Sequence, residues 1–263
     1  IGVGSSPAHC DFFDNTNNGT GYHLFVTRYN QNVNRVVRLD YGNDINNTPT
    51  QTTLNTTGVQ TGGDYGKNEG IEIIYENGEY YGFLAVWNHI YRFDFGADLM
   101  NNSPDVTLVG GAYQSEFSWA HSYDMYKIGA NWWGIVAARS GELAILYFGN
   151  EIEGDVLSVW TYDGGNPGAQ FTGADLVVEN DNYYVLACDF QNGLIRFDFG
   201  NSLANVPTAQ NLGIFGDGNQ WSVLAYKECG DSYAVYVMKE TGDDHKLLRF
   251  TPSCSWRLCR WHC

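Results

Sequence analysis

The sequence predicts an all-β protein, a five-bladed β-propeller with four antiparallel strands in each blade. Three observations support this prediction: a repeat of about 53 residues, short strand-like runs bounded by turn residues, and no helical periodicity of any length. Blades of four short strands, repeated at even spacing, are typical of propellers. The main alternative is a β-sandwich, which does not repeat itself at this interval.

A glycine that ends an RFDFG-like run marks the repeat. It occurs at Gly42, Gly96, Gly149 and Gly200, with spacings of 54, 53 and 51 residues. The fifth copy, LLRFTPS, ends at Ser253, 53 residues after Gly200. We therefore expect one propeller domain over residues 1–263, with blades at about 8–58, 59–112, 113–165, 166–216 and 217–263.

The same four runs follow one another within each unit. In the second unit they are IEIIYENG from Ile71, EYYGFLAVW, HIYRFDFG, and DVTLVGG from Asp105. The runs are rich in β-branched and aromatic residues. The turns NQNVN, SGE, QNG and ETGDD join the second and third runs of the other units, and their Gly and Asn residues tolerate the positive φ of hairpins. The first unit begins with its own innermost strand, AHCDFFDN, and the last ends with an outermost strand, SWRLCRWHC.

Composition excludes several classes of function. Apolar residues make up 43% of the chain and charged residues 17%, which is a globular composition. The formal charge of −16 repels phosphate backbones and anionic membranes, so we expect no nucleic-acid partner and no membrane insertion. The even cysteine count and the abundance of Asn, Gly, Thr and Tyr favour a secreted or cell-surface protein.

Two kinds of disulfide are compatible with the sequence. The cysteines lie at positions 10, 188, 229, 254, 259 and 263. Cys10 could pair with a cysteine of the tail and close the ring, which is worth about 4 to 5 kcal/mol for a loop of about 250 residues. Alternatively, Cys229 pairs with the tail inside the fifth blade. Cys188 lies in the middle of a strand, as a buried thiol would.

When the units are aligned, a carboxylate residue recurs at the beginning of the innermost strand; we call this set the column of carboxylates. Alignment of the units places together Asp11, Glu72, Asp124 and Asp175. Such a ring at the mouth of the central channel could bind Ca²⁺ or Mg²⁺ through oxygen ligands, or a polar ligand. The alternative is structural: each carboxylate caps a turn or accepts a neighbouring backbone amide.

Aromatic residues recur on the same predicted face. They come from the loop before the innermost strand and from the turn between the second and third strands: Tyr65, Trp87, Phe117, Trp119, Phe171 and Trp221. Flat rings beside Asn, Asp and Arg can hold sugar rings by apolar stacking and oriented hydrogen bonds. The same rings could instead fill the gaps between blades.

Another repeated pattern, Arg-x-Asp, indicates a structural role rather than a functional site. Three units carry it in the third strand, at positions 38/40, 92/94 and 196/198. Residues two apart share one face of a strand, so the two charges can satisfy each other between blades. The sequence contains no GxSxG, HExxH, P-loop or GxGxxG motif that would indicate an enzyme class.

The repeats share a sequence motif, R[FL]D[FY]Gx[SD][LI]xNxP. This motif resembles repeats of large secreted surface proteins of Bacteroidetes, including adhesins associated with gliding motility and type IX secretion. The resemblance covers the whole chain and implies a surface-displayed module of a larger chain or assembly. We therefore expect a noncatalytic, adhesin-like or lectin-like propeller that binds a glycan or a protein partner. The alternatives are a five-bladed glycoside hydrolase that uses inner-strand carboxylates, and a structural module of a surface filament.

Overall fold

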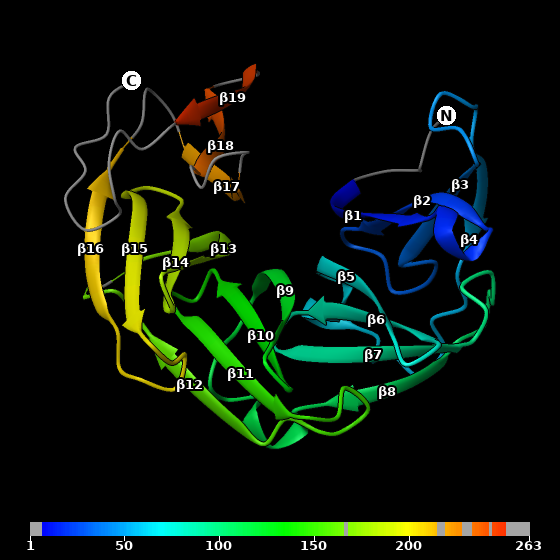
Figure 1. Ribbon diagram of the computed structural model, residues 1–263, viewed down its shortest axis with the longest axis horizontal. Helices are drawn as coiled ribbons and strands as arrows, with labels where there is room; N and C mark the ends of the chain where they lie inside the picture. The colour runs from blue at the N-terminus through cyan, green and yellow to red at the C-terminus, as the bar shows by residue number, and fades with distance from the viewer. Residues whose placement is uncertain (1–6, 166–167, 215–218, 228–232, 242–243, 251–263) are drawn as a thin grey trace. The chain divides into compact units, whose positions relative to one another are not determined.

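The computed structural model describes residues 7–165, 168–214, 219–227, 233–241 and 244–250 (Figure 1). The described chain forms five antiparallel sheets with three short 3-10 turns, η1 (Thr16–Asn18), η2 (Gly63–Gly66) and η3 (Gly111–Tyr113), and it contains no α-helix. In this part of the chain no helix is therefore long and apolar enough to cross a membrane.

The strands of every sheet are neighbours in the order in which they follow along the chain. The first sheet contains β1 (Pro7–Asn15), β2 (Gly21–Arg28), β3 (Val36–Gly42) and β4 (Thr50–Thr53). The second contains β5 (Asn68–Glu76), β6 (Glu79–Val86), β7 (His89–Gly96) and β8 (Asp105–Val109). The third contains β9 (Ala120–Ile128), β10 (Asn131–Ala138), β11 (Leu143–Gly149) and β12 (Ser158–Tyr162). The fourth contains β13 (Phe171–Glu179), β14 (Asn182–Asp189), β15 (Gly193–Gly200) and β16 (Thr208–Gly213). The fifth has three described strands, β17 (Asn219–Lys227), β18 (Tyr233–Thr241) and β19 (Asp244–Phe250).

These sheets confirm the predicted all-β architecture and its repeat of four antiparallel strands. The predicted last strand, SWRLCRWHC, lies outside the described residues. The glycines that mark the repeat have positive φ at the ends of the third strands, between 65° and 78°. An L side chain rarely adopts this conformation, which explains why glycine recurs at these positions.

The chain divides into two compact units, and each is described by itself. The first contains residues 1–134 and 147–158, and the second contains residues 135–146 and 159–263. In the first unit, strand β6 is buried at every position from Tyr80 to Val86, so both of its faces pack against other parts of the protein. This double burial is expected of the middle strands of a stacked sheet. The core of the second unit is built around Val177, Leu186, Leu194 and Val235.

The Arg-x-Asp pairs of the first unit have the predicted structural role. The Nε atom of Arg38 lies 2.7 Å from a carboxylate oxygen of Asp40, and the Arg92 and Asp94 pair has the same distance. Arg38 also donates to the carbonyl oxygen of Leu99 at 2.7 Å, which fastens the third strand of one sheet to the loop of the next. In the second unit, Arg196 donates to the side chain of Gln210.

The described cysteines differ in burial. Cys188 is buried, as predicted, and burial together with the charge of Asp189 raises the pKa of its thiol well above the usual range. Cys10 is exposed and forms no disulfide within the described chain. The remaining four cysteines lie outside the described residues, so both disulfide hypotheses stay predictions.

Candidate active site

A buried carboxylate with two side-chain partners lies at the start of β5 in the first unit. Glu69 occupies a bulge, between the cross-strand pairs Asn68 with Val86 and Gly70 with Ala85. A bulge re-aims the side chain that it adds to a strand. The side chain of Glu69 is 6% exposed. Its Oε1 accepts the indole N–H of Trp119 at 2.7 Å, and its Oε2 lies 2.9 Å from Nε2 of His121.

A second histidine lies close to this carboxylate. Burial lowers the pKa of His9 to about 4, with a further lowering by His121 and an opposing effect of Glu69. His9 is therefore neutral at neutral pH. Its Nδ1 atom is buried and has no hydrogen-bond partner among the described residues. A buried polar atom without a partner costs stability, and such atoms recur where a site serves function.

Two indole rings lie beside Glu69 on strained backbone. Trp87 and Trp119 have φ of 56° and 55°, a left-handed conformation that is uncommon for bulky residues and frequent in functional sites. The peptide N–H of Ala120 donates to the carbonyl oxygen of Trp87 at 2.6 Å and holds the two loops together. The ring centroids are 5.8 Å apart.

The ammonium group of Lys67 contacts both indole rings. Its ammonium nitrogen lies 4.2 Å from the ring centroid of Trp87 and 4.1 Å from that of Trp119. The same nitrogen is 2.8 Å from a carboxylate oxygen of Asp64. Cation–π contacts on both sides hold the rings in place before a ligand arrives.

The predicted column of carboxylates ties neighbouring sheets together. Asp11 accepts the backbone N–H of Ile73 at 2.7 Å, and Asp175 accepts that of Ala225 at 2.6 Å. Ile73 and Ala225 occupy equivalent positions in β5 and β17, so one interaction is used twice. An innermost strand has an unpaired edge, and the carboxylate of the preceding sheet satisfies one of its amides. This is the structural alternative considered for the column.

Asp11 nevertheless differs from an ordinary surface carboxylate. Burial raises its pKa to about 6, although the amides of Ile73 and Phe12 act in the opposite direction. Glu72 and Asp124 lie close enough to the buried Tyr123 for their charges, together with burial, to raise the pKa of its phenol.

Within the described part of the chain, no group of three or more His, Cys, Asp or Glu side chains could hold a metal ion. The predicted cation site at Asp11, Glu72, Asp124 and Asp175 stays a prediction, because Asp175 belongs to the second unit and the other three carboxylates belong to the first.

Five of the six predicted aromatic residues fall into three groups. Trp87 and Trp119 meet beside Glu69. Phe117 and Phe171 are buried, at 5% and 0% exposure, so a sugar has no access to their rings. Tyr65 is half-buried and packs edge-on against His89, at 5.1 Å between centroids.

The sixth predicted aromatic residue belongs to the second unit. Trp221 packs edge-on against Phe190 at 4.9 Å between centroids, and the guanidinium of Arg139 lies 5.5 Å from the Trp221 ring. This is a smaller aromatic and cationic cluster at the start of β17.

Sequence reasoning missed Glu69, His9 and Lys67 as members of a site, and it gave little weight to His121. The sequence carried a weak signal for two of these residues. Glu69 lies three residues before Glu72, and His121 lies three residues before Asp124, so both occupy the same position in the repeat. A position where one unit has Glu and the next has His breaks the repeat, and such a break is expected where blades take different functional roles.

No protein-family model and no curated protein matches this sequence. Solved structures do match. An exo-β-1,3-galactanase from Phanerochaete chrysosporium is 12% identical, with a TM-score of 0.60 over 97% of this chain and 62% of that one. A GH62 α-L-arabinofuranosidase from Coprinopsis cinerea is 10% identical, with a TM-score of 0.57 over 74% of this chain and 67% of that one. A putative exo-β-1,3-galactanase from Bifidobacterium bifidum is 9% identical, with a TM-score of 0.60 over 97% of this chain and 90% of that one.

These matches show the fold, which is that of propeller-type glycoside hydrolase domains. They correct the functional prediction. The noncatalytic adhesin-like module is contradicted, because the structures that share the fold are glycoside hydrolases. Nothing in the matches links the chain to adhesins of Bacteroidetes or to type IX secretion.

Proposed function

We propose that this protein hydrolyses glycosidic bonds, with its active site around Glu69. One observation carries the proposal: the buried carboxylate of Glu69 contacts Trp119 and His121 in a fold that glycoside hydrolases share. Trp119 and its neighbour Trp87 both have a strained, left-handed backbone. In this proposal the five sheets are five blades, residues 1–263 form one propeller domain, and the innermost strands β1, β5 and β9 present the site.

The two carboxylates have different roles. Glycoside hydrolases use a pair of carboxyl groups, one as a proton donor to the leaving oxygen and one as a base or nucleophile. A raised pKa, about 6 for Asp11, suits the proton donor. Glu69 accepts the indole N–H of Trp119 and lies 2.9 Å from a ring nitrogen of His121, which suits a group that accepts a proton.

Glu69 is better suited to act as a base than as a nucleophile, because both of its oxygens already accept a hydrogen bond. Asp11 would give its proton to the glycosidic oxygen as the bond to the anomeric carbon breaks. Glu69 would take a proton from water as the water oxygen bonds to the same carbon. The reaction then proceeds with inversion of the anomeric centre.

Trp87 and Trp119 form the sugar-binding wall in this proposal. Their rings offer apolar faces to the C–H groups of a sugar, and their fixed backbone limits the entropy that is lost on binding. Tyr65 belongs to the proposal only as an outer contact. The substrate is a glycan side chain or chain end, and we place the enzyme outside the cell, where such substrates occur.

A substrate panel with matched variants tests the proposal. The panel contains β-1,3-galactotriose, cellotriose and arabinose-substituted xylan, and released sugars are quantified by chromatography. Glu69→Gln and Asp11→Asn should each abolish release while the far-UV spectrum is retained. Asp175→Asn is the matched control, because Asp175 accepts a backbone amide from the equivalent position of β17 in the second unit and has no assigned role in catalysis. Release by the Glu69→Gln protein at the wild-type rate would rule out the assigned site.

A further inference from the structure

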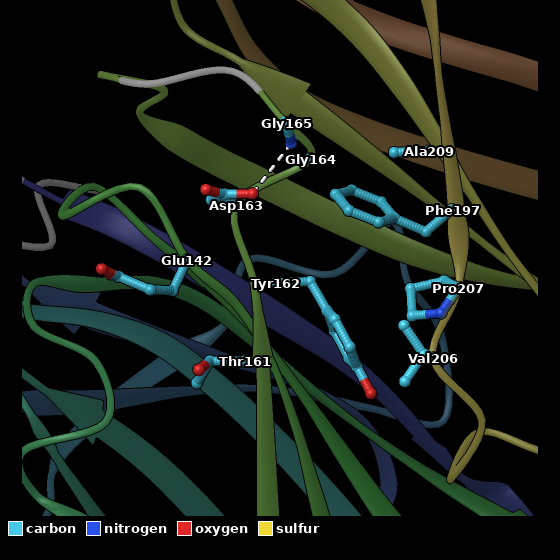
Figure 2. A pocket seen from close by; sticks show the side chains of 10 residues that line it. All are labelled: Glu142, Thr161, Tyr162, Asp163, Gly164, Gly165, Phe197, Val206, Pro207 and Ala209. Atoms are coloured by element: carbon cyan, nitrogen blue, oxygen red, sulfur yellow. Dashed lines mark hydrogen bonds between the residues drawn. The ribbon is translucent and has the colours of Figure 1, made fainter.

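A groove on the second unit lies between the end of β12 and the start of β16 (Figure 2). Its volume is about 630 Å³, in the range of a small-ligand site. All of its lining residues belong to the second unit, among them Glu142, Tyr162, Asp163, Gly164, Val206 and Pro207.

Tyr162 forms a fixed aromatic wall of the groove. Its ring packs edge-on against Phe199 at 5.5 Å between centroids. Its hydroxyl group donates to the carbonyl oxygen of Asn205 at 3.3 Å. A ring that is held at its edge and at its hydroxyl group loses little freedom when a ligand stacks on it.

Oxygen acceptors and an apolar edge lie on opposite sides of this ring. Figure 2 shows the carboxylates of Glu142 and Asp163 on one side of Tyr162, with Val206 and Pro207 on the other. Val206 is 85% exposed, so its apolar side chain is open to solvent at the edge of the groove.

The carboxylates and the groove floor are also fixed. One oxygen of Asp163 accepts the N–H of Gly165 at 2.8 Å, and Glu142 accepts the hydroxyl group of Ser140. Gly164 has φ of +67°, and a Cβ atom there would lie 3.2 Å from the Phe197 ring. The absence of a side chain at Gly164 keeps the groove open between Tyr162 and the carboxylates.

We propose that this groove binds a neutral sugar unit of a glycan chain through residues that all belong to the second unit. A pyranose or furanose ring has an apolar C–H face for the Tyr162 ring, and hydroxyl groups that donate to Glu142 and Asp163 on the same side of that ring. The ligand class rests on the proposed function, whereas the groove itself does not.

Binding is measured in the Glu69→Gln background, so that no ligand is consumed. Affinity electrophoresis with soluble arabinose-substituted xylan and with β-1,3-galactan gives the dissociation constants. Tyr162→Ala should weaken binding about tenfold, because an aromatic wall is lost. Tyr162→Phe keeps the ring and should bind within about twofold of the parent. Tyr75→Ala removes another exposed tyrosine, in the first unit, and should leave binding unchanged.

Each outcome decides the proposal. Loss on Tyr162→Ala with retention on Tyr162→Phe supports the groove, even if the protein hydrolyses nothing, in which case the proposed function falls alone. Equal affinity of the Tyr162→Ala and parent proteins overturns it. Binding to polylysine with no binding to either polysaccharide also overturns the proposal, because Glu142 and Asp163 would then bind a cationic peptide.

Discussion

Asp11 and His9 lie two residues apart on β1, and burial shifts their pKa values in opposite directions. The pKa of Asp11 rises from 3.8 to about 6, and that of His9 falls from 6.5 to about 4. The folded protein holds the Asp11 proton more tightly than the unfolded chain does, so this group lowers stability as pH rises from about 4 to about 6. The unfolded chain holds the His9 proton more tightly, so that group lowers stability as pH falls from 6.5 to about 4.

The two effects have similar size. One pKa unit corresponds to about 1.4 kcal/mol, and each group shifts by a little over two units, so each effect is about 3 kcal/mol in the free energy of unfolding. In the wild type they oppose each other over the same pH range. In Asp11→Asn only the His9 effect remains, while the amide oxygen of Asn can still accept the N–H of Ile73.

Urea unfolding at pH steps from 4 to 7.5 measures the difference. Relative to the wild type, Asp11→Asn should gain stability at pH 7 and lose that gain progressively toward pH 4, by about 3 kcal/mol over the range. Because all other titrating groups are shared, the difference between the two proteins isolates Asp11. A pH-independent difference would refute the reasoning, since it would mean that burial does not hold the Asp11 proton.

Three further predictions concern packing, sugar binding and cations. Trp119→Ala should raise KM about tenfold or more, measured by initial rates on the best substrate of the panel, because the sugar wall and a hydrogen bond to Glu69 are lost. Gly134→Ala should cost about 1 to 3 kcal/mol in urea unfolding, because its Cβ atom would lie 2.8 Å from the hydroxyl oxygen of the buried Tyr123. The column of carboxylates predicts a Ca²⁺ site that remains to be tested: Ca²⁺ should raise the melting temperature and EDTA should reverse the rise, whereas identical melting curves would remove calcium from the interpretation.

The regular sequence repeat made the fold predictable. A glycine every 51 to 54 residues needs a positive φ at the end of a third strand, and that local requirement repeats with the blade. Turn residues and strand-like runs then located most strands to within a few residues. The sequence also pointed to the column of carboxylates, and Asp11 and Asp175 fulfil the structural alternative by accepting amides across sheets.

The site was harder to predict, for two physical reasons. Glu69 reaches its partners through a bulge, and a bulge changes side-chain direction without a sequence signature that pattern reading can detect. Burial also differs between residues that have equivalent positions in the repeat. Trp119 lies at the site, whereas Phe171 is fully buried.

The noncatalytic prediction followed from the resemblance of the repeats to those of surface proteins, whereas an active site would require the blades to diverge. The divergence is present three residues before the column of carboxylates. At that position successive first strands carry Glu69, His121, Thr172 and Trp221. Of these, Thr172 donates to a neighbouring backbone carbonyl, while Glu69 and His121 pair with each other.

The most direct measurement is sugar release from the substrate panel, followed by proton NMR of the first product formed. The wild-type protein should release a monosaccharide with inverted anomeric configuration, and Glu69→Gln should release at least about a hundredfold less at an unchanged melting temperature. No release from any substrate by the wild type, or equal release by Glu69→Gln, would contradict an active site at Glu69.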